Sequence, residues 1–211
     1  MSKTGLKNFF NFYSKYYEKD VINKYFKNNH KVILDELNFL DKKKIVDIGC
    51  GPAELGREIL SRWPNNYYLG VDISDKMIKI AKNRLCDFEN ARFCIGDVMD
   101  LNLKSNKFDL VLNSISFHHY EKPSKALNEM IRILKPSGTL IILDSVRSNT
   151  HIMPLYWDFV ESRYCYSRHL TIKEFDVLLS RSKNITYKYK IIKHLFPANH
   201  ILISVRKLKC C

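Results

Sequence analysis

The 211-residue sequence contains no apolar run that approaches about 20 residues, the length that a membrane-spanning helix needs. We therefore expect no integral membrane segment. Residues 1–19 also lack the apolar core of a secretory signal peptide, which favours a cytoplasmic location.

Metal-binding cysteine patterns are missing as well. None of the six cysteines takes part in a Cys-x-x-Cys pair, so the ligand spacing of a structural zinc site is absent. A chain of this size with 45% hydrophobic residues builds a core without disulfides. We expect neither a bound metal nor a disulfide framework.

Acidic residues are few: 22 Asp and Glu face 35 Lys and Arg, a formal net charge of +13. A basic surface is typical of nucleic-acid binding. However, most of these cations are lysines spread along the chain, and no arginine-rich stretch occurs. This pattern favours a solvated surface over a nucleic-acid partner. A second interpretation is that the net positive charge attracts an anionic acceptor or a membrane.

Short apolar runs alternate with helical stretches through the middle of the chain. Such alternation predicts βαβ units and a parallel sheet. Two further β-rich runs near the end predict an antiparallel hairpin at the edge of the sheet. The strands are expected at residues 44–48, 67–72, 91–95, 108–113, 139–144, 186–195 and 200–207, and the helices at 53–63, 74–85 and 122–134.

We expect one domain over residues 1–211, because no repeat or low-complexity linker interrupts it. Residues 1–41, rich in Phe and Tyr, are expected to form an N-terminal helical cap. Residues 145–185 interrupt the step from the fifth strand to the sixth. We expect this insertion to shape a pocket for an acceptor.

A glycine loop follows the first expected strand, with Gly49 and Gly51 leading into a helix. A strand that delivers such a loop to a helix N-terminus leaves backbone N–H groups that a ligand can approach. A dinucleotide site would have a third glycine where Glu54 stands. Asp47 beside the loop would repel a pyrophosphate, yet it suits an ammonium or sulfonium group. The loop therefore favours S-adenosylmethionine over a dinucleotide.

Polar side chains also follow the next three strands. Asp72 ends the second strand about 20 residues after Gly51, where a carboxylate accepts hydrogen bonds from ribose hydroxyls. Asp97 follows the third strand and Asn113 ends the fourth. Ligands of open parallel sheets bind outside the carboxyl ends of the strands. This edge is the predicted cofactor site.

These residues resemble the class I S-adenosylmethionine-dependent methyltransferases, in particular the small-molecule group with the ubiquinone and menaquinone methyltransferases. The resemblance covers about Lys44 to Asp144 and implies an α/β, Rossmann-like sheet of seven mostly parallel strands. The implied order is 3-2-1-4-5-7-6, with the last strand antiparallel and helices on both faces. The matching segments are Val46–Gly51, Gly70–Ser74, Gly96–Asp97, Phe108–Val111, His118–His119 and Arg132–Gly138.

The resemblance also implies roles for single residues. The loop of Asp47, Gly49, Cys50 and Gly51 would face the methionyl part of the cofactor, and Asn113 its ammonium. Asp72 would hold the ribose and Ile73 would pack on the adenine. Asp97 would bind the adenine amino group, with the Val98 backbone beside it. Two departures occur: Pro52-Ala53 replaces a further glycine, and Ser137 replaces the first of a glycine pair.

Two features suggest groups near the reacting methyl. Tyr13 and Tyr17 share a face of the expected N-terminal helix, and Tyr17 is predicted to cover the sulfonium, unless the helix is only a cap. His118 is the predicted catalytic base, for an acceptor that must lose a proton. His119 is interpreted as structural, and packing is the alternative role for both histidines.

The predicted function is methyl transfer to O, N or activated C of a small, apolar or aromatic acceptor, releasing S-adenosylhomocysteine. Aromatic residues within 153–170 support such an acceptor, and we expect a monomer or weak dimer. An RNA or protein methyltransferase is one alternative. The fourth strand, however, continues as Asn-Ser-Ile-Ser, without the Pro-Pro-aromatic turn of base-amino methylation. A non-catalytic cofactor-binding module is the second alternative, and a nicotinamide dehydrogenase is more remote.

Overall fold

The computed structural model describes residues 3–16, 20–37, 41–147, 153–163, 166–193 and 198–209. Seven strands form one twisted sheet in the order β3-β2-β1-β4-β5-β7-β6. All neighbours pair in parallel except β7, which is antiparallel to both β5 and β6. The strands are β1 (Lys44–Ile48), β2 (Tyr67–Asp72), β3 (Ala91–Ile95), β4 (Phe108–Ser114), β5 (Leu134–Ser145), β6 (Ile185–Ile192) and β7 (His200–Lys207).

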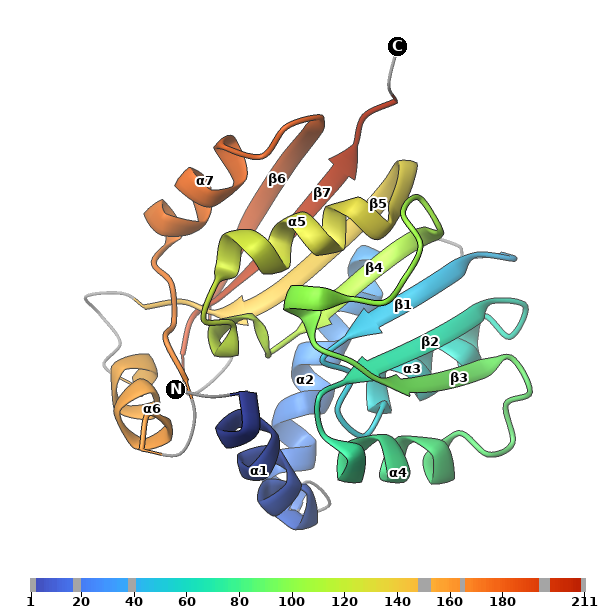
Figure 1. Cartoon of the computed structure of the whole chain (residues 1–211), viewed down its shortest axis with the longest axis horizontal. Helices are drawn as coiled ribbons and strands as arrows, with labels where there is room; N and C mark the ends of the chain where they lie inside the picture. Colours follow the sequence, from blue (N-terminus) through green and yellow to red (C-terminus); the bar gives the residue numbers. More distant parts are fainter. Residues whose placement is uncertain are drawn as a thin grey trace.

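Helices cover both faces of the sheet (Figure 1). They are α1 (Lys3–Tyr13), α2 (Asp20–Glu36), α3 (Glu54–Arg62), α4 (Asp75–Arg84), α5 (Pro123–Ile133), α6 (Met153–Glu161) and α7 (Ile172–Ser180). Short 3-10 turns are η1 (Ser14–Tyr16), η2 (Val98–Asp100) and η3 (Phe117–His119). No helix of the described ranges is long and apolar enough to cross a membrane.

Two hydrophobic cores lie on the two faces because successive side chains of a strand point in opposite directions. In β1, Val46 and Ile48 belong to the core beneath α5 and α7. Ile45 points to the opposite face of the sheet and belongs to the core beneath α2, α3 and α4. Strands buried on both faces read as continuous apolar runs, which explains why the central strands could be found from the sequence.

The predicted fold class is confirmed, including the strand order and the antiparallel strand. One prediction of detail is wrong. The fifth strand, expected to begin at residue 139, begins at Leu134 directly after α5, so residues 135–138 lie within β5. Ser137 has a positive φ of 63°, and the pairing of β4 with β5 shifts register near Phe108. The connection is therefore an irregular start of the strand. The division into a cap, a domain and an insertion stays a prediction.

The N-terminal helix α1 is fastened to the start of α4. Asn11 accepts a hydrogen bond of 2.6 Å from the Ser74 hydroxyl and donates one of 3.1 Å to Asp75. Lys7 pairs with Asp75 at 2.9 Å. Because α4 begins just after β2 ends, these contacts hold α1 near the carboxyl ends of the strands (Figure 1).

A buried tyrosine of β2 depends on a glycine of α3. Tyr68 is 1% exposed, and its hydroxyl donates a 2.8 Å hydrogen bond to Oδ2 of Asp47. A Cβ atom at Gly56 would lie 2.3 Å from Cζ of this ring. The missing side chain is therefore what lets the ring reach Asp47.

We predict that Gly56→Ala lowers the free energy of unfolding by about 1–3 kcal/mol, because overpacking against the buried ring outweighs the better helix propensity of alanine. Urea unfolding monitored by circular dichroism measures the change. Ser61→Ala, on the exposed side of the same helix, is the control and should have little effect. A Gly56→Ala protein as stable as the wild type would contradict this account of Tyr68.

Candidate active site

A pocket lies at the carboxyl ends of β1 to β4. Its lining comes from the turns after these four strands, together with side chains of α1, α2, α3 and α4 and Tyr166. The predicted site residues Asp47, Gly49, Cys50, Gly51, Asp72, Ile73, Asp97 and Val98 all belong to this lining. The structure thus brings together eight of the predicted site residues.

The glycine loop is shaped by hydrogen bonds to the neighbouring strand. The backbone N–H groups of Gly49 and Cys50 both donate to the Val71 carbonyl, at 2.8 and 3.0 Å. That of Gly51 donates to Oδ2 of Asp72 at 2.9 Å. The expectation that these N–H groups point at a ligand is therefore wrong, since they are used within the protein. Gly49 has a φ of +74°, and a Cβ there would lie 2.5 Å from Oγ of Ser116.

Asp47 is a buried carboxylate, 2% exposed, on the wall of the pocket. Its Oδ2 accepts the hydrogen bond from Tyr68, whereas its Oδ1 has no hydrogen-bond partner among the described residues. Burial raises the pKa of Asp47 to about 7, and the nearby Asp72 carboxylate adds to the shift. An unpaired buried acceptor is costly, so a cationic donor in the pocket would satisfy it.

Two more carboxylates organise the turns around them. Asp72 accepts hydrogen bonds from the N–H groups of Gly51 and Ser74, at 2.9 and 2.8 Å. Burial raises its pKa to about 6, although these N–H groups act in the opposite direction. Asp97 accepts a hydrogen bond from the Met99 N–H at 2.9 Å and caps the turn η2. Both carboxylates therefore hold backbone and also face the pocket.

Asn113 stands behind the pocket and does not contribute to the lining that the structure describes. Its side-chain amide is fully buried and lies 2.8 Å from the Ile48 carbonyl, 2.7 Å from Oγ of Ser116 and 2.8 Å from the Tyr120 hydroxyl. Ser116 and Tyr120 do line the pocket. The geometry therefore assigns Asn113 to the support of these two residues, a role different from the predicted direct contact.

Helices α1 and α2 close the pocket with a different set of side chains from the one expected. Leu6 and Phe10 of α1, and Phe26 and His30 of α2, belong to the lining. Leu6 and Phe10 are four residues apart and so share one face of α1. Tyr17, the predicted cover of the sulfonium, lies outside the described residues.

The histidine that faces the pocket is His119, whereas His118 is not among the described lining residues. The His119 ring contacts Phe10 edge-on, with centroids 5.0 Å apart. Its Nδ1 lies 3.1 Å from the Tyr166 carbonyl oxygen and must donate to it, so Nε2 carries the lone pair of the neutral ring. Burial, followed by the neighbouring His118, lowers the pKa of His119 well below its usual value.

His118 belongs to a buried network beside the pocket. Its Nδ1 lies 2.7 Å from Oδ1 of Asp144, and its backbone N–H donates to Oδ2 at 2.8 Å. The His169 ring stacks on it, with centroids 4.2 Å apart and an interplanar angle of 12°. Nδ1 of His169 is held in turn by Asp158 at 2.6 Å. Although burial opposes ionisation, His118 holds the pKa of Asp144 below its usual value.

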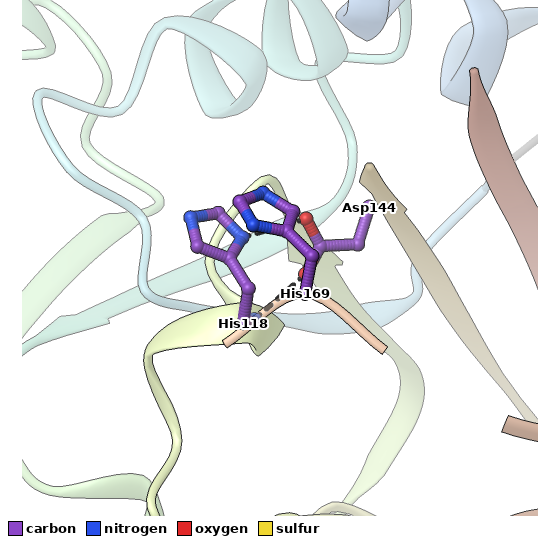
Figure 2. A group of neighbouring side chains, drawn as sticks. All are labelled: His118, Asp144 and His169. Atoms are coloured by element: carbon purple, nitrogen blue, oxygen red, sulfur yellow. Dashed lines mark hydrogen bonds and ion pairs between the residues drawn. The ribbon is translucent and has the colours of Figure 1, made fainter. Parts of the chain in front are cut away.

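The ligand atoms of His118, Asp144 and His169 lie within 4.8 Å of one another, as a metal site would require. Figure 2 shows the two rings side by side, next to Asp144. An ion lies in the plane of each imidazole that binds it, and two nearly parallel stacked planes share no such point. We therefore interpret this group as a hydrogen-bond network.

Sequence reasoning missed His119, Tyr166, Phe10 and His30 as pocket residues. The helical spacing of Leu6 and Phe10 was a usable signal, because it marks one face of α1. No local pattern could have linked Tyr166 to His119, since that contact joins segments far apart in the chain. The choice between adjacent histidines depends on how the turn η3 is oriented.

Comparisons with known proteins agree with this geometry. The profile of a family described as "Methyltransferase domain" matches residues 40–159, more than half of the chain. The chain is 26% identical over 181 residues to a demethylmenaquinone methyltransferase of Staphylococcus saprophyticus, covering 83% of this chain and 78% of that protein.

Two solved structures show the same fold. One is a Haloferax volcanii putative methyltransferase in complex with the activator Trm112, with a TM-score of 0.76 and 19% identity over 89% of this chain and 93% of that one. The other is an S-adenosylmethionine-dependent methyltransferase from Mesorhizobium loti, with a TM-score of 0.69 and 19% identity over 84% and 96% of the two chains.

The family match covers all four strand ends that build the pocket, and the sheet has the strand order that the sequence motifs implied. The chain therefore belongs to the methyltransferase domain family and is a class I S-adenosylmethionine-dependent methyltransferase.

Proposed function

We propose that the enzyme methylates a small apolar acceptor with a hydroxylated aromatic ring, of the quinol kind. The observation that carries this proposal is the pairing of a neutral, pocket-facing His119 with the ring of Phe10. An apolar wall suits an aromatic ring, and a neutral imidazole accepts a proton from a hydroxyl group. The name of the Staphylococcus saprophyticus relative, whose acceptor is a demethylated menaquinone, supports the same class of acceptor.

The carboxylates at the strand ends fit the cofactor, which supplies a methyl group on a sulfonium centre. Oδ1 of Asp47 would accept from the methionyl ammonium and Asp72 from the ribose hydroxyls. Asp97 and the Val98 backbone would face the adenine, and Ile73 would pack on it. Asn113 would act through Ser116 and Tyr120, which it holds against the loop of Gly49.

The reaction needs alignment and the removal of one proton. The cofactor, when bound, would supply the methyl group as an electrophile and would leave as neutral S-adenosylhomocysteine. His119 Nε2 would take the acceptor's proton, so the positive charge of the sulfonium would end on the imidazole ring. Tyr166 fixes the tautomer of His119 through its carbonyl oxygen.

The charge of +13 keeps an RNA acceptor as a second candidate. A direct test supplies methyl-labelled cofactor to a fractionated extract and asks which fraction becomes labelled. Label in the lipid or small-molecule fraction supports the proposal. Label in RNA or protein would support the alternative, and no label despite cofactor binding would favour a non-catalytic module. Filter binding of bulk RNA at two salt concentrations separates true RNA affinity from charge attraction.

We predict that Asp72→Ala lowers the affinity for S-adenosylhomocysteine at least a hundredfold, because two hydrogen bonds to a charged acceptor are lost. Isothermal titration calorimetry measures the affinity, and thermal unfolding checks the fold. Asp100→Ala, an exposed carboxylate of η2, is the control. Because Asp72 also holds Gly51 and Ser74, Asp72→Asn is a milder second variant. Wild-type affinity in both folded variants would disprove the ribose role.

The raised pKa of Asp47 predicts that cofactor binding depends on pH. The ammonium needs the ionised carboxylate, which is present above about pH 7 and lost below it. We expect the affinity for S-adenosylhomocysteine to fall up to about tenfold per pH unit below 7. In Asp47→Asn the affinity should be lower at pH 8 and nearly constant between pH 6.5 and 8. An unchanged pH profile in this variant would exclude Asp47 as the group responsible.

We predict that His119→Gln lowers kcat about a hundredfold or more while the affinity for S-adenosylhomocysteine stays near the wild-type value. Because burial lowers the pKa of His119 well below 6.5, the wild-type kcat at saturating cofactor should not decrease between pH 8 and 6. His118→Gln is the matched comparison. If His118→Gln alone lost activity while remaining folded, the base would be His118, as the sequence predicted.

A further inference from the structure

Among the side chains that the structure describes, four large apolar ones are exposed on α1 and α6. They are Phe12 (58% exposed) on α1, and Leu155, Tyr156 and Phe159 (60%) on α6. Positions 155, 156 and 159 lie on one side of a helix. Other exposed apolar residues, such as Tyr67 on β2, Val177 on α7 and Tyr189 on β6, belong to separate elements. We call the four residues on α1 and α6 the apolar rim.

Cations accompany the aromatic rings of the apolar rim. The Lys15 ammonium lies 4.1 Å from the centroid of Phe12, and the Arg163 guanidinium lies 4.8 Å from that of Phe159. Residues 3–16 contain lysines but no acidic residue. Asp158, on α6, turns inward, where its carboxylate accepts hydrogen bonds from the Ser167 hydroxyl and the His169 N–H.

The two helices flank the same pocket. Phe10 of α1 contacts His119, and the carbonyl group that holds His119 belongs to Tyr166, just beyond α6. Asp158 fastens α6 to His169 of the same segment. Figure 1 shows α1 and α6 beyond the carboxyl ends of the strands, where the pocket lies. An apolar acceptor would thus reach the pocket past exposed aromatic residues.

Exposed aromatic rings next to Lys and Arg match the boundary between lipid headgroups and acyl chains. There the ring enters the apolar region while the cation meets anionic headgroups. The net charge of +13, which the cofactor site does not use, adds long-range attraction to an anionic surface. A protein partner would match the apolar side chains equally well, but it would not explain the basic excess over the whole chain.

We propose that the apolar rim docks on an anionic lipid bilayer and presents the pocket to acceptors dissolved in it. The biological reason for this surface rests on the proposed apolar acceptor, whereas the surface itself can be tested without catalysis.

The test measures co-sedimentation with phosphatidylcholine vesicles that contain or lack phosphatidylglycerol. We expect the wild type to bind the anionic vesicles at least tenfold more tightly than the neutral ones, and high salt to weaken this binding. The double variant Phe12→Ser/Phe159→Ser should lose at least tenfold in affinity. The control Val177→Ser/Tyr189→Ser removes two exposed apolar residues elsewhere and should bind like the wild type.

Three results would overturn the proposal: no binding of the wild type to anionic vesicles, equal binding by the rim variant, or an equal loss of binding in the control.

Light scattering of vesicle-free samples tests whether a second copy of the chain binds the apolar rim instead. A dimer that forms in the wild type and is abolished in the rim variant would assign the rim to a dimer interface. Methylation of a water-soluble quinol by the wild type separates the two proposals. If the wild type methylates the quinol but does not bind vesicles, only the membrane inference is wrong. If the wild type binds vesicles but does not methylate the quinol, the proposed function is wrong.

Discussion

The geometry of the cofactor edge depends on one buried carboxylate, Asp72. Its two oxygens join the glycine loop after β1 to the first turn of α4, through the N–H groups of Gly51 and Ser74. Ser74 in turn caps α4 and binds Asn11 of α1. The glycine loop, α4 and the helix α1 over the pocket are therefore all positioned, directly or through Ser74, by this one side chain. Because desolvation of this carboxylate is costly, the N–H donors around it are needed for its charge to persist.

Much of this arrangement could be predicted from the sequence, because parallel strands deliver their carboxyl ends to one edge. Once the strands were found, Asp47, Asp72 and Asp97 had to meet there. Asn113 shows the limit of that argument. It ends a strand like the others, yet its amide lies behind the pocket. The position of a residue at a strand end determines the edge of the sheet at which it lies. The turn that follows the strand determines whether its side chain points into the pocket.

The two histidines differ for the same reason. His118 and His119 are neighbours in a 3-10 turn, so their side chains leave it in different directions. One ring meets Asp144 and the stacked His169, and the other meets Phe10 in the pocket. These partners come from β5, from the segment before α7 and from α1. No local pattern specifies contacts of that range. Tertiary packing alone distinguishes the supporting ring from the one that faces the pocket.

The place of β7 has a consequence for the synthesis of the chain. β7 follows β6 in the chain but lies between β5 and β6 in the sheet, so β6 leaves the ribosome before the described strand that it pairs with. Strands β1 to β5 can pair with one another at that stage, because all five have been made. The outer edge of β5 stays open until residues 200–207 arrive, and an open strand edge is a template for wrong pairing. The basic side chains of β6, Lys188 and Lys190, pair with Glu36 of α2, a helix that is made earlier, so these ion pairs favour contact of β6 with its own chain.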